Sequence, residues 1–140
     1  MNEAPPNAWG DRTAPSLADV EALADAAFAR LPDRFRALCA GVVIHVVDFP
    51  DDETLDEMGA ESEFDLLGLF RGSGLPQRGA ADETGQMPNM IWLYRRPLID
   101  FWADGEDTLG EVVTHVVVHE IGHHFGLSDD DMEAIEDEAR

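Results

Sequence analysis

The sequence predicts an α+β fold in which a small sheet, of about three strands, is flanked by helices. Three observations lead to this prediction. Short segments rich in β-branched and aromatic residues, which favour strands, are interspersed with longer segments whose apolar residues recur at helical spacing. Two of the longer segments begin with typical helix N-cap residues, Ser16 and Thr108. The length of 140 residues is that of one domain, which we place at residues 16–140.

The first part of the chain is predicted to be a tail followed by helices. Residues 1–15 are rich in Pro, Asn and Gly, so they are expected to form a flexible tail. Ser16 then caps a helix whose apolar residues follow helical spacing up to Leu31. Pro32 interrupts this pattern, and a second, shorter helix is expected to run to Cys39.

Three short segments have the composition of strands. Residues 42–47 are mostly β-branched, residues 64–70 are rich in leucine and phenylalanine, and residues 90–96 begin with apolar and aromatic side chains. A short helix is expected at residues 54–58. Residues 75–89, which contain Pro, Gly, Gln and Asn, are expected to form the loop before the third strand.

The C-terminal third is predicted to hold three helices. A short one is expected at residues 98–102. Thr108 and Glu111 have the spacing of a capping box, and the helix that they begin should end just before Gly126, because glycine tolerates the left-handed conformation that stops a helix. A final, acidic helix is expected at residues 129–139.

Residues 112–118 present a conflict, because they consist mostly of valine, which favours strands. A capping box precedes them and a glycine stop follows, and intrinsic propensity is a weak preference that tertiary context overrides. We therefore predict a helix. A helix that is apolar on most sides is a buried one, so this helix should lie at the centre of the core and hold its side chains rigidly.

The second half of this helix begins the motif H-E-x-x-H-x-x-G-x-x-D, from His119 to Asp129. Residues four apart lie on one helix face, so His119 and His123 can direct two imidazoles at one metal ion. Catalytic zinc usually has three protein ligands and keeps a fourth position for water. Gly126 allows the chain to reverse, and Asp129 is close enough beyond it to return a carboxylate to the metal as the third ligand.

This predicted zinc site would acidify a water molecule at its open position. Glu120, about 100° round the helix from His119, would take the proton of this water and pass it to the leaving amine. Asp129 also lies at an acidic helix start, where the helix dipole favours carboxylates without any metal. Glu133 and Glu136 therefore remain alternative third ligands, although their spacing is short.

Two further histidines and one cysteine accompany the motif. His115 lies one turn before His119 and could support a metal ligand or touch a substrate, but such a histidine is more often a satisfied core residue. His124 lies on another face of the helix and is interpreted as a packing residue. Cys39, the single cysteine, is expected to pack as a small core residue.

The composition argues against several functions. Thirty acidic and nine basic residues give a net charge of −21, so nucleic-acid binding is not expected. No stretch reaches the ~20 apolar residues that span a bilayer, and the N-terminus lacks the pattern of a secretion signal. We therefore predict a cytoplasmic protein, with no membrane partner and with a preference for cationic or neutral substrates.

The segment from His119 to Asp129 resembles the metzincin-type signature in its aspartate form, and residues 16–138 are similar in layout to the minimal zincin-like metallopeptidases of bacteria. The resemblance rests on the leading helix, the strand at 42–47, the Leu-rich strand with its turn at Gly72, and Tyr94-Arg95-Arg96-Pro97. It implies a zincin-like fold in which a small sheet flanks the HExxH helix. It also implies that a substrate strand can dock along the sheet edge.

The chain differs from full metzincins, which have a methionine-containing turn well downstream of the third ligand. Met132 is too close to Asp129 to be that turn, so the lower wall of the cleft is expected to be nearly absent.

The sequence is consistent with two functions. One is a zinc metallopeptidase that hydrolyses peptides or unfolded proteins, with a protein partner that could complete the cleft. The other is a binding module for peptides or proteins that keeps the metal and has little or no turnover.

Overall fold

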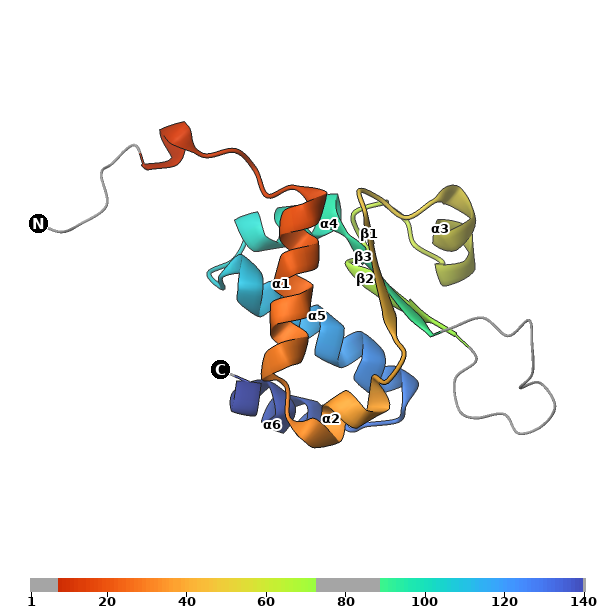
Figure 1. The fold of residues 1–140 in the computed structure, drawn as a ribbon. Coiled ribbons are helices and arrows are strands. Elements are labelled where there is room, and N and C mark those ends of the chain that lie inside the picture. The colour runs from red at the N-terminus through yellow and green to blue at the C-terminus, as the bar shows by residue number, and fades with distance from the viewer. Residues whose placement is uncertain (1–7, 73–88, 140) are drawn as a thin grey trace, which may run out of the picture.

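The computed structural model describes residues 8–72 and 89–139 and confirms the α+β fold with three strands (Figure 1). The strands are β1 (Val43–Val47), β2 (Gly68–Arg71) and β3 (Met90–Tyr94). The helices are the 3-10 helix η1 (Ala8–Asp11) and the α-helices α1 (Leu17–Arg30), α2 (Asp33–Leu38), α3 (Asp52–Met58), α4 (Arg95–Ala103), α5 (Leu109–His124) and α6 (Asp129–Ala139). The predicted flexible segment 1–15 is described only from residue 8, and of the predicted loop at 75–89 only Asn89 is described.

The sheet is mixed, with β3 in the centre. β1 runs parallel to β3 and pairs Ile44 with Ile91, whereas β2 runs antiparallel and pairs Phe70 with Ile91. Since side chains alternate between the faces of a sheet, these three residues project from the same face. They belong to or pack against the buried core, so this face is the inner one.

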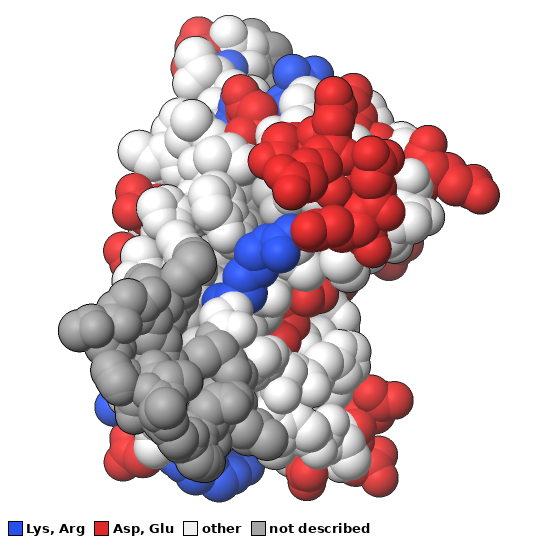
Figure 2. Space-filling model, turned by 90° about the vertical axis from the view of Figure 1, so that its right-hand side faces the viewer, with Lys and Arg blue, Asp and Glu red and all other residues white. Residues whose placement is uncertain are grey.

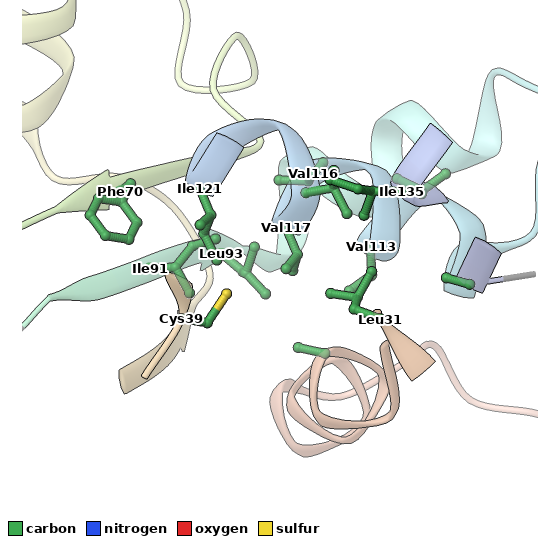
Figure 3. Close-up of a cluster of buried hydrophobic side chains, with 14 of the residues drawn as sticks. Leu31, Cys39, Phe70, Ile91, Leu93, Val113, Val116, Val117, Ile121 and Ile135 are labelled. Carbon is green, nitrogen blue, oxygen red and sulfur yellow. The ribbon is translucent and has the colours of Figure 1, made fainter. Parts of the chain in front are cut away.

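Helices α1 and α5 cover the inner face of the sheet, and α3 lies on the opposite side (Figure 1). Figure 3 shows Ile91 and Leu93 of β3 directed at Val117 and Ile121 of α5. α5 begins with the predicted capping box and is buried on most sides, as expected for a central helix. Its valines therefore form a helix in spite of their strand propensity, because burial in the core outweighs that preference.

Two elements differ from their predicted bounds by more than two residues. The strand expected at 64–70 is formed only at Gly68–Arg71, because Ser62 and Asp65 bind nearby backbone amides and hold the preceding residues in a turn. The helix expected at 98–102 begins earlier, at Arg95, so the strand before it ends at Tyr94. Pro97 fits inside the first turn of α4, where no intrahelical partner exists for an amide.

The surface over α3 is strongly acidic. Residues 48–65 have an acidic side chain at nine positions and contain neither lysine nor arginine. Figure 2 shows these acidic side chains gathered on one side of the molecule. Arg71 of the adjoining strand forms an ion pair with Glu57, at 2.6 Å, at the boundary of this surface.

The connection between α5 and α6 brings the last helix back against the HExxH helix. Gly126 has a φ of +81°, and the amide of Leu127 donates to the carbonyl of Gly122 at 2.9 Å, which is the pattern of a glycine-terminated helix. The Ser128 hydroxyl then accepts from the amide of Asp131 and caps α6. The reversal is therefore as predicted, and it brings the carboxylates of α6 close to the histidines of α5.

Candidate metal centre

Three histidines form a ladder along one face of α5. His115, His119 and His123 are each one turn apart. The ring centroids of His115 and His119 are 3.9 Å apart, and those of His119 and His123 are 5.6 Å apart. The side chain of His119, at 24% exposure, is the most buried of the three, because it lies between the other two. The predicted pair His119 and His123 thus shares a face, and His115 extends it by one turn.

Glu136 of α6 faces this ladder. Its Oε2 atom lies 3.0 Å from Nε2 of His119 and 3.0 Å from Nδ1 of His115. The carboxylate is only 13% exposed. Within the described residues, His115, His119 and Glu136 form the one group of three ligand atoms that all lie within 4.8 Å of one another. Of the two alternative third ligands, Glu136 is therefore in contact with the ladder, whereas Glu133 lies exposed on α6.

Asp129 lies at the other end of the ladder, beside His123. Its Oδ1 atom is 4.0 Å from Nε2 of His123, and its side chain is 91% exposed. The His123 side chain is also mostly exposed, at 61%. The predicted ligands His119, His123 and Asp129 are thus neighbours in space, but they do not meet at one point in the way that His115, His119 and Glu136 do.

The side chains at this face of α5 have the chemistry of a zinc site. With metal–ligand distances of 2.0–2.1 Å, two ligand atoms of a tetrahedral zinc site are roughly 3.3 Å apart. The 3.0 Å contacts of Glu136 are close to this spacing, and the 4.0 Å separation of His123 and Asp129 exceeds it by less than 1 Å between two exposed side chains. Imidazole and carboxylate ligands together suit zinc. The residues that are present therefore fit this metal.

Burial favours the neutral form of the central imidazole. It lowers the pKa of His119, and the neighbouring His115 lowers it further, against an opposing effect of the Glu136 carboxylate. A neutral imidazole has a lone pair available for a metal ion. His119 is therefore prepared to act as a ligand at neutral pH.

Glu120 lies beside the ladder and is turned toward the sheet. Burial raises the pKa of its carboxyl group, while the nearby His123 and a hydrogen bond from the backbone amide of Phe70 act in the opposite direction. Phe70 belongs to β2, so the carboxylate is held between the HExxH helix and the edge strand. A partly buried carboxyl group with a raised pKa, beside potential metal ligands, has the properties of a general base.

The neighbouring residues confirm two packing predictions. His124 stacks on the Phe70 ring with centroids 4.2 Å apart, and Cys39 is buried in the core. The contact of His115 with Glu136 was not predicted. The sequence does show that His115 continues the four-residue spacing of His119 and His123. Which carboxylate faces these histidines, however, depends on how α6 packs.

The family comparison agrees with this geometry. Residues 39–139 match the model of the zincin-like metallopeptidase family, and the chain belongs to this family. No curated protein sequence matches the chain significantly. None of the helices in the described ranges is long and apolar enough to cross a membrane.

Proposed function

We propose that the protein is a zinc-dependent peptidase in which His119, His123 and Asp129 hold the metal and Glu120 is the general base. The observation that carries this proposal is the placement of Glu120, a partly buried carboxyl group with a raised pKa, on the same helix as two histidines one turn apart. When bound, zinc would polarise a peptide carbonyl and lower the pKa of water.

The protein's own contribution to hydrolysis is proton transfer by Glu120. Its carboxylate accepts a proton from the attacking water and then donates that proton to the leaving amine. A raised pKa makes the Glu120 carboxylate a stronger base for the first step, and a group whose pKa is nearer neutral pH can cycle between its ionised and protonated forms during turnover. The backbone amide of Phe70 stabilises the ionised form of this carboxylate.

The sheet edge supports a peptide as the substrate. β2 pairs with β3 on one side, and no strand of the described chain pairs with its other side. β2 also packs against α5, so an extended peptide that hydrogen-bonds along this edge would run past the metal centre. The acidic surface over α3 favours cationic over anionic peptides.

A second candidate function is a binding module for peptides or proteins that keeps the metal without turnover. The exposure of Asp129 and its 4.0 Å separation from His123 favour it, because they leave one side of the site open to solvent. A protein partner could close this side. The retained Glu120 favours the peptidase instead, since a binding module has no use for a general base beside the metal.

The variant Glu120→Gln tests the peptidase. It should retain zinc, because Glu120 is not a proposed ligand, and hydrolysis of a peptide library should fall by about 10²–10⁴-fold. Glu133→Gln is the matched control, since it makes the same chemical change at an exposed position and should leave hydrolysis unchanged. Equal cleavage by the Glu120→Gln variant and the parent would refute the mechanism. Peptide binding without any chelator-sensitive cleavage by the parent would identify the binding module.

A further inference from the structure

The carboxylate of Glu136 contacts two histidines, although Glu136 is not one of the proposed catalytic ligands His119, His123 and Asp129. It lies 3.0 Å from one nitrogen of His115 and from one nitrogen of His119, and it is nearly enclosed between α5 and α6. The three ligand atoms come from two helices that pack against each other. Neither His115 nor Glu136 belongs to the H-E-x-x-H-x-x-G-x-x-D motif.

We propose that His115, His119 and Glu136 form a second metal-binding position, distinct from the one that His119, His123 and Asp129 provide. Its ligands are two imidazole nitrogens and one carboxylate oxygen, a donor set that suits zinc and related divalent transition metals. The contacts of 3.0 Å are near the separation of roughly 3.3 Å expected between ligand atoms of a tetrahedral zinc site. These two contacts of Glu136 therefore need to lengthen only slightly to admit an ion.

The structure favours this group over the motif ligands as a metal position that is already assembled. Glu136 is 13% exposed, whereas Asp129 is 91% exposed and has to be ordered before it can bind. Ordering an exposed side chain costs conformational entropy, which a nearly buried side chain has already lost on folding. The second position therefore competes for the ion although it lacks His123.

His119 belongs to both positions, and its Nε2 atom is the one that faces Glu136. One nitrogen cannot bind two ions, so the two positions exclude each other and the chain holds one ion through His119 at a time. An ion held by His115 and Glu136 would be withdrawn from Glu120, which lies toward His123 and Phe70. In that position the metal would be held away from the proposed general base. This consequence rests on the proposed function, whereas the binding of a metal by His115, His119 and Glu136 does not.

Metal binding by the full-length protein tests the second position directly. The double variant His123→Ala/Asp129→Asn removes the two ligands that belong to the motif alone. After removal of metal, we expect zinc titration by calorimetry to give one ion per chain for this variant. Adding Glu136→Gln should then weaken zinc binding by at least about a hundredfold, because a direct ligand contributes more than a supporting residue does. Adding Glu133→Gln instead makes the same change on the same helix and should leave binding unchanged.

The possible results separate this proposal from the proposed function. If the double variant takes up no zinc while the parent binds zinc and cleaves peptides, the second position is refuted and the peptidase stands. If Glu136→Gln and Glu133→Gln give equal affinities, the Glu136 contact is only a hydrogen bond. A parent that takes up no zinc refutes both proposals.

A measurement on the unmodified protein covers the case in which the double variant does not fold. Nitrogen-15 spectra of the imidazole rings report which histidine binds a metal. We expect zinc to shift the Nδ1 signal of His115, assigned with a His115→Gln variant, in at least part of the molecules. An unchanged His115 signal at saturating zinc would overturn the second position.

Discussion

Substitution of Gly122 by alanine tests whether α6 is held in one position against the HExxH helix. A Cβ atom at Gly122 would lie 2.9 Å from Cγ of Met132 and closer still to its sulfur. Carbon atoms prefer about 3.5–4.0 Å, so Met132 has to move by roughly 1 Å. Met132 is fully buried, so its side chain has to be repacked within the core. Overpacking of this kind costs about 1–3 kcal/mol, which exceeds the gain of about 1 kcal/mol from replacing glycine in a helix.

Gly110 in the same helix provides the matched control. The atom nearest to a Cβ at Gly110 is 3.8 Å away, which is an ordinary contact. Gly110→Ala should therefore stabilise the fold by about 0.5–1 kcal/mol, and Gly122→Ala should destabilise it by up to about 2 kcal/mol. Urea unfolding of the metal-free proteins, followed by circular dichroism, measures this difference of about 2 kcal/mol. Equal or greater stability of Gly122→Ala would show that α6 is not fixed against α5 in this way.

Three further predictions concern buried groups. Burial raises the pKa of Glu120, and the general base must be unprotonated to act. The acidic limb of the pH profile of kcat/KM should therefore lie above the ordinary glutamate range. A limb within that range would contradict the assignment of Glu120 as the base. The same shift means that the folded state binds the proton more tightly than the unfolded chain, so stability falls as pH rises through the folded pKa. Metal-free Glu120→Gln, which lacks this charge, should therefore be more stable than the parent in urea at neutral pH but not at acidic pH. Burial raises the pKa of Cys39 to about 12, so a thiol reagent should label it at neutral pH only after denaturant is added.

Much of the fold was predictable because its signals are local. The capping boxes at Ser16 and Thr108, the positive-φ position of Gly126 and the β-branched run of β1 all appear where the sequence placed them. The short β2 strand was harder to delimit. The residues before β2 are apolar enough for a strand, but the Asp65 carboxylate accepts hydrogen bonds from the amides of Glu61 and Ser62. This turn competes with the strand for the backbone amides, and the sequence pattern gives little sign of it.

The carboxylate that faces the histidines was not predictable with the same certainty. α6 offers acidic side chains at most of its exposed positions, and its composition does not distinguish among them. Which carboxylate reaches α5 depends on the rotation and distance of α6, and these depend on how its buried side chains pack, including Met132 against Gly122. That contact turns Glu136 toward His119 and leaves Asp129 exposed beside His123.

The helical period of α5 explains why one short helix can serve both the core and the site. Val113, Val117 and Ile121 recur every four residues and are fully buried. The ladder that begins at His115 has the same period but is offset by two residues, or about 200°, so it lies on the opposite side from these apolar residues. Glu120 falls between the two sets, beside Ile121 and His119, and this intermediate position makes it buried enough for its pKa to rise while it still reaches the edge strand. The tight packing that stabilises the helix therefore also shifts the pKa of the proposed base, so changes to the core face of α5 are expected to alter both stability and chemistry.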